Sequence, residues 1–204
     1  MIWKSWQELP DDMRCEAVRP YYDILASKRR DLMIKSVFDR LMAAILLVVL
    51  SPIFLLLAVW IKLDSEGPVF FRQERVTQYG KSFRIYKFRT MVQNAEQLGA
   101  QVTSKGDMRV TSVGQALRKC RLDELPQLIN ILEGTMSFVG TRPEVPRYVA
   151  AYTNEMKATL LLPAGVTSVA SIRYKDEDTL LDAADDVDAV SYTHLRAHET
   201  GRNL

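Results

Sequence analysis

Residues 41–61 read LMAAILLVVLSPIFLLLAVWI, and no charged side chain occurs among them. A run of about 20 apolar residues is long enough to cross the hydrocarbon core of a bilayer as one helix. About forty residues precede the run and no small-residue cleavage site follows it, so it is not a cleavable signal peptide. The segment therefore predicts that the chain is attached to a membrane.

Two features of this segment favour a helix that enters the membrane and returns over one that spans it. Ser51-Pro52 lies in the middle, where proline removes a helical hydrogen bond and clashes with the preceding turn. Because cytoplasmic flanks of membrane helices are rich in Lys and Arg, basic flanks on both sides place both ends on one face. These flanking residues are Lys28, Arg29, Arg30, Lys35 and Arg40 before the run, and Lys62, Arg72 and Arg75 after it. We predict a re-entrant helix over residues 35–62, broken at Ser51 and Pro52, with a single span as the alternative.

The chain as a whole has the composition of a folded protein. It has 204 residues, of which 48% are hydrophobic and 25% charged. This composition lacks the low hydrophobicity that is typical of disordered chains. Its two cysteines form no CxxC motif, so a reducing compartment is the simpler assumption. The only two histidines, His194 and His198, stand four apart near the C-terminus and form a weak candidate for a metal site. A Ser-His-Asp or Cys-His site in the body of the chain is thereby excluded.

Charge is distributed unevenly along the chain, although the formal net charge is only +2. Residues 62–122 carry twelve Lys and Arg against five Asp and Glu, whereas residues 176–190 carry seven acids and no base. A basic middle attracts phosphates, membrane headgroups or nucleic acid, and the charge alone does not choose among them. The absence of a nucleic-acid motif and the presence of the apolar run argue against nucleic acid.

After residue 62 the pattern changes to that of a small soluble domain. Residues 68–72 and 83–88 are rich in β-branched and aromatic residues, with a turn over 78–81 between them, which predicts a β-hairpin. Helical spacing occurs in four stretches, residues 90–100, 113–121, 122–132 and 147–162, and a short strand is expected over 136–139. We predict an α+β fold, in which a small mixed domain is attached directly to the re-entrant helix.

Asp123 and Glu124 form the main candidate for a catalytic pair. Pro126 is tolerated only in the first turn of a helix, so a helix is expected to start near Asp123, a favoured N-cap residue. The helix dipole, together with Arg118 and two further cations upstream, would hold a carboxylate ionised and attract a phosphate. An ionised Asp123 facing a phosphate is what an aspartyl nucleophile requires, and Glu124 is suited to hold Mg²⁺. Capping of a helix without any function is the alternative interpretation.

Three further cations are candidates for phosphate binding. Glycine and proline bracket Arg142 in a stiff turn, which would present its planar fork to a phosphate. Arg142 can equally well pair with a neighbouring glutamate such as Glu144. Lys87 and Arg89 share one face of an expected strand, which is otherwise an ordinary solvated basic face.

Taken together, six stretches resemble the monotopic phosphoglycosyl transferases, a bacterial sugar transferase family. Each stretch is weak alone, but six in the family's order, over roughly residues 35–175, make a specific signal. In chain order they are FDR (38–40) before the apolar run with Ser51-Pro52, GPVFFRQER (67–75), YKFRTM (86–91), LRK with LDELPQ (117–119, 122–127), SFVG with RP (137–140, 142–143) and PAGVTS (163–168).

The resemblance implies a membrane-bound transferase that moves a sugar 1-phosphate from a UDP-sugar to polyprenyl (undecaprenyl) phosphate and releases UMP. It implies that Asp123 is the nucleophile that forms an aspartyl-phosphosugar, and that Glu124 and Asp123 associate with Mg²⁺. Substrate phosphates would bind to the cations Lys87, Arg89, Arg118 and Arg142. The expected location is the bacterial inner (cytoplasmic) membrane, with the catalytic domain on the cytoplasmic face. Membrane lipid is a further partner, nucleic acid is not, and the sequence carries no signal for the sugar, the polyprenol length or an oligomeric state.

The sequence departs from the family's pattern in two places. Thr141 stands where the family usually has proline, and no match is found after about residue 188. Residues 191–204 (SYTHLRAHETGRNL) look foreign in composition. We therefore expect an N-terminal segment over 1–34 that is either interfacial or an ordinary surface helix, the re-entrant helix over 35–62, a catalytic domain over 63–188, and a non-native or disordered tail over 189–204. The alternative function, from another class, is a non-catalytic membrane-anchored interaction module.

Overall fold

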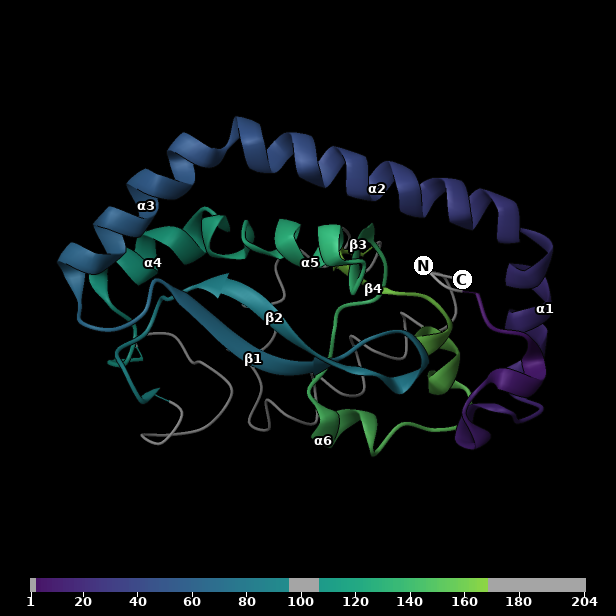
Figure 1. The fold of residues 1–204 in the computed structure, drawn as a ribbon. Helices are drawn as coiled ribbons and strands as arrows, with labels where there is room; N and C mark the ends of the chain where they lie inside the picture. Colours follow the sequence, from purple (N-terminus) through teal and green to yellow (C-terminus); the bar gives the residue numbers. More distant parts are fainter. Residues whose placement is uncertain (1–2, 96–106, 169–204) are drawn as a thin grey trace.

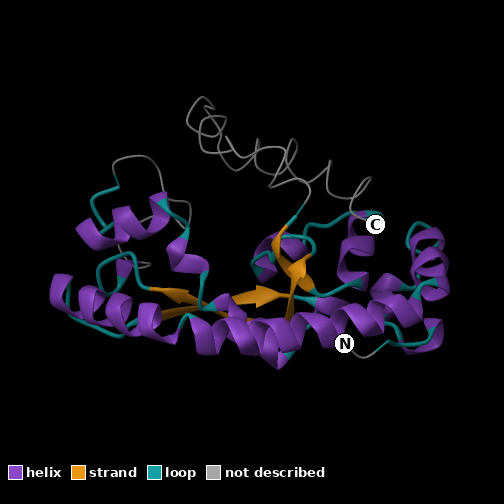
Figure 2. Cartoon of the chain, turned by 90° about the horizontal axis from the view of Figure 1, so that it is seen from above, coloured by secondary structure: helices purple, strands orange, loops and turns teal. Residues whose placement is uncertain are grey.

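The computed structural model describes residues 3–95 and 107–168 of the chain, which combine helices with two small sheets (Figures 1 and 2). This mixture confirms the predicted mixed helical and sheet character. The α-helices are α1 (Arg19–Ser27), α2 (Arg29–Val49), α3 (Ser51–Asp64), α4 (Ser112–Lys119), α5 (Gln127–Glu133) and α6 (Pro146–Val149). The strands are β1 (Phe70–Val76), β2 (Ser82–Phe88), β3 (Met136–Val139) and β4 (Ala164–Thr167). Short 3-10 turns are η1 (Trp6–Glu8), η2 (Asp11–Met13), η3 (Gln78–Gly80), η5 (Leu122–Glu124) and η6 (Met156–Leu161).

A bent pair of helices, α2 and α3, forms one outer layer of the molecule (Figure 1). The two helix axes differ by 62° across Leu50, so the predicted break at Ser51-Pro52 is confirmed. Pro52 has no N–H to offer the carbonyl of Val48, and the hydroxyl of Ser51 donates to that carbonyl instead, at 2.7 Å. The helical pair is longer than predicted, because it begins at Arg29 and ends at Asp64 rather than covering residues 35–62.

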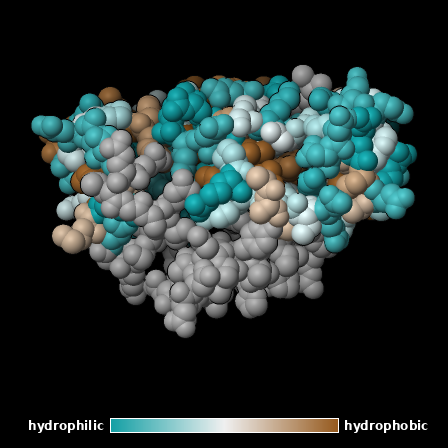
Figure 3. Space-filling model, turned by 90° about the horizontal axis from the view of Figure 1, so that it is seen from below, coloured by the Kyte–Doolittle hydropathy of each residue, from teal (hydrophilic) through white to brown (hydrophobic). Residues whose placement is uncertain are grey.

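The outward face of the bent pair is apolar. Within the described part of the chain no single helix is long and apolar enough to cross a membrane, whereas α2 and α3 together meet that test as a bent pair. The large apolar side chains that they expose include Ile34, Phe38, Leu41, Ile45, Val48, Val49, Leu55, Leu56, Trp60 and Leu63. Hydrophilic side chains prevail among the described atoms of the opposite face (Figure 3). The molecule is therefore apolar on one side.

The inward face of the bent pair packs on the rest of the domain through two buried clusters. Ala43 of α2 lies in a cluster with residues of β2, α5 and β3, namely Phe83, Ile85, Leu128, Ile131 and Met136. Leu57 and Ile61 of α3 lie in a second cluster with Phe88, Val113 and Leu117. Burying side chains of this size stabilises a fold by about 1.5–3 kcal/mol each. The helical pair and the domain thus form one packed body.

Both sheets have two strands. β1 and β2 pair antiparallel as the predicted hairpin, with Phe70 opposite Phe88 and Val76 opposite Ser82. β3 and β4 pair parallel, with Met136 opposite Ala164. The sequence predicted β3, whereas β4 was missed.

Three of the four predicted helices differ from the structure. Residues 113–121 correspond to α4, but Thr90 to Asn94 form no helix, and residues 96–100 lie outside the described part of the chain. In place of the helix predicted over 122–132, η5 precedes the shorter α5. The helix predicted over 147–162 is replaced by the four-residue α6 and the separate turn η6.

The N-terminal segment folds onto the domain instead of standing apart from it. Residues of η1, η2 and α1 build a third buried cluster against the tip of the hairpin and η6, with Leu9, Met13, Val18, Tyr22 and Leu25 on one side and Val76, Tyr79, Leu160 and Leu161 on the other. The rings of Trp3 and Trp6 pack against Tyr22. The segment is thus packed onto the domain through these apolar contacts.

Candidate functional site

Asp123 and Glu124 lie just after a sharp change in backbone conformation at the end of α4. Arg121 adopts the left-handed conformation, with φ of 54°, and this ends the helical path of α4. The next three residues form η5, and α5 begins only at Gln127, after Pro126. The expectation that Asp123 caps a helix is therefore wrong, because Asp123 lies inside the 3-10 turn η5 and Pro126 is the residue that directly precedes α5.

Glu124 is the centre of an ion cluster that joins three distant parts of the chain. Its Oε1 accepts a hydrogen bond from Nζ of Lys87 on β2 at 2.8 Å and lies 3.6 Å from Nη2 of Arg142. The side chains of Glu124 and Lys87 are 13% and 21% exposed, whereas that of Arg142 is 43% exposed. Two cations thus share one carboxylate at a partly open surface.

The cluster strongly favours the ionised form of Glu124. Burial disfavours the charge, but Lys87 and Arg142 outweigh it and lower the pKa of Glu124 to about 2. Burial disfavours the charge of Lys87 too and therefore lowers its pKa. Glu124 opposes this effect, and Arg142 adds to it. Burial therefore works against both charges, and the ion pair outweighs it for Glu124 but not for Lys87.

Asp123 lies in the same electrostatic field but responds differently. Burial raises its pKa; Lys87 opposes this rise, Glu124 adds to it, and Arg118 opposes it again. Burial thus outweighs the nearby cations at Asp123, whereas the cations outweigh burial at Glu124. A less acidic carboxylate is a better nucleophile, so the difference suits a division of roles between the two.

Arg118 reaches this region from α4. Its Nε donates to Oγ1 of Thr90 at 2.9 Å, and its charge acts on Asp123. Lys87 and Arg142 thus lie against Glu124, and Arg118 acts on the neighbouring Asp123. Arg121 also acts on Glu124, so the cations outnumber the two carboxylates, which suits the binding of a phosphate.

The turn that carries Arg142 is held by backbone contacts on two sides. The N–H of Gly140 donates to Thr167 of β4 at 3.0 Å, and the N–H of Gly165 donates to Thr141 at 2.8 Å. On the other side, the N–H of Val76 donates to the carbonyl of Glu144 at 2.8 Å. Arg75 of β1 also donates through Nη1 to the carbonyl of Pro143 at 3.1 Å. Sequence reasoning missed this role of Arg75, since the contact joins residues 68 positions apart.

Glycine at position 165 permits the close approach of β4 to the turn. A Cβ at this position would overlap the backbone nitrogen and oxygen of Gly140. We expect Gly165→Ala to destabilise the fold by about 1–3 kcal/mol, because backbone atoms must move apart. We also expect kcat/KM of the active protein to fall, because Arg142 moves with the turn. The control Gly80→Ala places a strained residue (φ of 71°) in open space at the hairpin tip, so it should lower the unfolding temperature with no selective loss of kcat/KM. Equal kcat/KM in both variants would contradict the prediction.

Arg89 does not belong to the cluster. It is 6% exposed, and Nη2 donates to the carbonyls of Ile61 and Ser65, at 3.3 and 2.6 Å, near the end of α3. A cation at a helix C-terminus satisfies carbonyls that have no partner within the helix. The expected phosphate-binding role of Arg89 is therefore replaced by a structural one.

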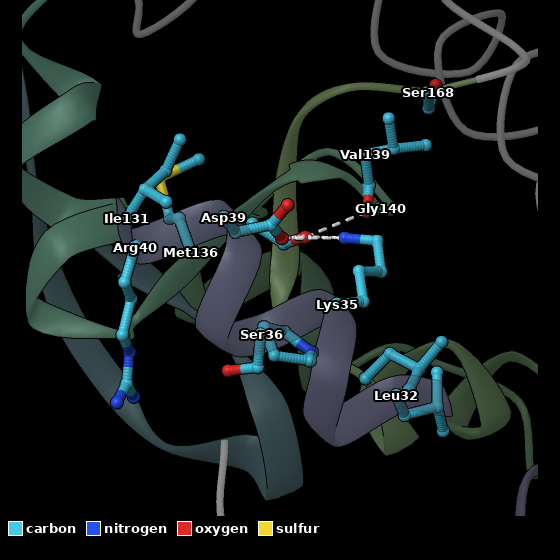
Figure 4. A pocket seen from close by; sticks show the side chains of 14 residues that line it. Leu32, Lys35, Ser36, Asp39, Arg40, Ile131, Met136, Val139, Gly140 and Ser168 are labelled. Atoms are coloured by element: carbon cyan, nitrogen blue, oxygen red, sulfur yellow. Dashed lines mark hydrogen bonds and ion pairs between the residues drawn. The ribbon is translucent and has the colours of Figure 1, made fainter. Parts of the chain in front are cut away.

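A separate cavity of about 200 Å³ lies between α2 and the β3–β4 pair. Figure 4 shows Asp39 and Lys35 pointing toward each other there, while Arg40 points to another side. Asp39 is 6% exposed and its Oδ2 accepts from Lys35 at 2.7 Å and from Ser137 at 2.6 Å. The hydrogen bonds among Lys35, Asp39 and Ser137 thus anchor α2 to β3.

The candidate metal ligands at the site are the two neighbouring carboxylates, Asp123 and Glu124. Across residues 3–95 and 107–168, no group of three or more His, Cys, Asp or Glu is placed to hold a metal ion. Asp123 and Glu124 offer carboxylate oxygens, the ligand type that Mg²⁺ takes, usually one or two carboxylates together with water and substrate phosphates. His194, His198 and the predicted tail over 189–204 lie outside the described residues.

Comparison with known proteins points to one family. Residues 30–197 match the family described as bacterial sugar transferase. The chain is 52% identical over 123 residues (60% of the chain) to the UDP-N-acetylgalactosamine-undecaprenyl-phosphate N-acetylgalactosaminephosphotransferase of Aeromonas hydrophila, of which it covers 29%. It is 38% identical over 166 residues (79%) to the UDP-glucose:undecaprenyl-phosphate glucose-1-phosphate transferase of Escherichia coli, and 32% identical over 167 residues (74%) to the undecaprenyl-phosphate galactose phosphotransferase of Salmonella typhimurium. It covers 35% of each of the latter two, so the chain spans about a third of the length of these relatives.

Proposed function

The chain belongs to the bacterial sugar transferase family, and we propose that it transfers a sugar 1-phosphate from a UDP-sugar to undecaprenyl phosphate and releases UMP. The cluster of Lys87, Glu124 and Arg142 beside Asp123 is the observation that carries this proposal. The relatives named above act on undecaprenyl phosphate by their names, and they differ in the sugar. The chain combines a charge cluster suited to phosphates with one apolar face, as a transferase with a soluble and a lipid substrate requires.

The proposed reaction has two steps at one carboxylate. An oxygen of Asp123 bonds to the phosphorus that bears the sugar, while the bond from that phosphorus to the UMP oxygen breaks and UMP leaves. An oxygen of undecaprenyl phosphate then attacks the same phosphorus, and the bond to Asp123 breaks. Lys87, Arg118 and Arg142 orient the phosphates and balance the charge that develops on their oxygens. One site thus handles the two substrates in turn.

Mg²⁺ is the proposed cofactor, held by Glu124 with Asp123. When bound, the ion screens the repulsion between carboxylate and phosphate. We expect a chelator to abolish UMP release and added Mg²⁺ to restore it, whereas Ca²⁺ should restore less because it prefers a larger and looser shell of ligands. Full activity in the presence of the chelator would contradict this part of the proposal.

We propose that α2 and α3 enter the cytoplasmic leaflet of the bacterial inner membrane and return. The 21 residues of α2 and the 14 of α3, bent by 62°, put the apex only about 13 Å from a line that joins their outer ends, at about 1.5 Å per residue. The hydrocarbon core is about 30 Å thick, so a pair of this shape reaches less than halfway across. The basic residues at both ends support the same arrangement, with the catalytic domain on the cytoplasmic face.

Ser51 provides a test of this placement. In a bilayer, the Val48 carbonyl has no water to replace the Ser51 hydroxyl, so we expect Ser51→Ala to lower the free energy of unfolding by about 1–3 kcal/mol. The control is Ser27→Ala: the Ser27 hydroxyl donates to the Ile24 carbonyl, also at 2.7 Å, on the exposed end of α1. Water can replace that bond, so the loss should be within about 0.5 kcal/mol. Denaturant unfolding in lipid nanodiscs measures both, and equal losses would contradict a membrane environment at Ser51.

UMP release from a panel of UDP-sugars tests the proposed function. The protein in lipid nanodiscs is given undecaprenyl phosphate, Mg²⁺ and UDP-N-acetylgalactosamine, UDP-glucose or UDP-galactose, the sugars named for the relatives above. The proposal expects UMP and a lipid-linked sugar from at least one of them. Membrane binding without UMP from any sugar would instead indicate a non-catalytic membrane-anchored module.

A further inference from the structure

A buried amide joins the strand that carries Lys87 to the helix that follows Glu124. Asn130 of α5 is fully buried, and its Oδ1 accepts a hydrogen bond from the N–H of Tyr86 at 2.8 Å. Its Nδ2 donates to the carbonyl of Arg84 at 3.1 Å. Both partners are backbone groups of β2, two residues apart. In a sheet of two strands these groups would otherwise need a third strand, so the asparagine amide takes the place of that strand.

The same two elements carry the central ion pair of the site. Lys87 follows Tyr86 directly on β2, and Glu124 lies six residues before Asn130, in the turn that leads into α5. The amide of Asn130 thus holds the backbone of the residue next to Lys87, while Nζ of Lys87 joins Oε1 of Glu124 at 2.8 Å. A lysine side chain is a flexible four-carbon stem that loses much conformational entropy when its amine is fixed in an ion pair. The ion pair alone therefore fixes the distance between the two backbones poorly.

We propose that Asn130 is a positioning residue, which sets the distance between β2 and η5 and thereby holds Lys87 against Glu124. The catalytic consequence rests on the proposed function, whereas the structural consequence does not. A packing contact would hold α5 near β2 at any register, but two hydrogen bonds to one strand edge fix a single register.

The first test needs no substrate. In the folded protein, we measure how fast an amine-reactive acylating reagent modifies Lys87 and how fast the N–H of Tyr86 exchanges with deuterium. Asn130→Ala should raise both rates by about tenfold, since the local opening that exposes these groups becomes easier. Asn130→Asp keeps the acceptor for Tyr86 and loses the donor for Arg84, so it should raise the labelling of Lys87 while leaving more of the Tyr86 protection.

The matched control trims the next residue of the same helix. Ile131 is also fully buried, and Ile131→Val removes packing while it leaves the amide of Asn130 in place. The proposal expects unchanged protection of Lys87 and Tyr86 in this variant. Protection that falls equally in Ile131→Val, or that persists in both Asn130 variants, would overturn the proposal whether or not the protein is an enzyme.

The second test asks whether Asn130 acts through Lys87. In the assay of UMP release, Asn130→Ala should lower kcat/KM by about 10²-fold, mainly through kcat, because a small displacement of a charged group weakens transition-state binding. In a Lys87→Met background, the same change should cost little more, as expected when one residue works through the other. Losses that multiply in the double variant would overturn the proposal. If the parent protein releases no UMP, the proposed function fails, and the labelling result decides on Asn130 alone.

Discussion

Replacement of Asp123 by asparagine should stop the transfer of the sugar phosphate and leave the fold intact. The amide has nearly the shape of the carboxyl, but its oxygen is a poor nucleophile and it carries no charge. Loss of a nucleophile commonly costs about 10⁴- to 10⁶-fold in kcat. Removing a carboxylate whose pKa is raised by burial also removes an unfavourable buried charge, so the unfolding temperature of Asp123→Asn should not fall.

The measurement separates the two steps of the reaction. Without undecaprenyl phosphate, the parent protein should release UMP in a burst of about one equivalent per site, because the phosphosugar stays on Asp123. The variant should show no burst and should retain no label from a sugar-labelled substrate. The control Asp23→Asn changes an exposed carboxylate of α1 that pairs with Arg19 on the same helix, and it should behave like the parent. Undiminished transfer by Asp123→Asn would disprove the assignment of the nucleophile.

Local sequence signals were sufficient for the elements that short-range chemistry decides. The hairpin follows from two stretches rich in β-branched and aromatic residues with a turn between them, although β1 runs to Val76 and so ends four residues later than predicted. The bend follows from Pro52, which cannot donate to Val48 in any context. Ser51 then supplies the missing donor, so its place beside the proline has a direct physical reason.

Long-range packing decided the elements that sequence reasoning missed. β4 has only four residues, Ala164–Thr167, and its pairing with β3 depends on a segment more than 20 residues away. The apolar spacing over 147–162 predicted one helix, but the buried part of it, Ala158–Leu161, packs against the N-terminal segment as a 3-10 turn. The spacing of apolar residues indicates which side chains are buried, but tertiary contacts decide the backbone conformation of this segment.

In the site, too, local sequence signals identified some residues, whereas long-range contacts decided the roles of others. Asp123, Glu124 and Arg142 could be selected because acids and a bracketed arginine carry recognisable chemistry, and the structure places them in one region. Arg89 was assigned by assuming that the strand continued beyond Phe88. The strand ends there, and the guanidinium turns to the carbonyls at the end of α3. Asn130 carried no signal in the sequence, since an asparagine in an apolar helix gives no indication of its partner.

Loss of the charge on Lys87 should have the second largest effect on activity. Lys87→Met keeps the length and apolar stem of the side chain but removes the ammonium that contacts Glu124. We expect kcat/KM to fall by about 10²- to 10³-fold, the usual effect of losing one preorganised donor to a developing charge. The cluster would also lose one positive charge, which weakens its hold on a phosphate.

The pH profile of Lys87→Met makes the prediction specific. Lys87 lowers the pKa of both Glu124 and Asp123, so its removal must raise both values. Both carboxylates react or bind in their ionised form, so the acid limb of the kcat/KM profile should move to higher pH. Lys81→Met, in the exposed turn of the same hairpin, serves as the control and should leave that limb in place. An acid limb at the same pH in Lys87→Met and the parent would mean that neither carboxylate governs the rate, and the roles assigned to Asp123 and Glu124 would then both fail.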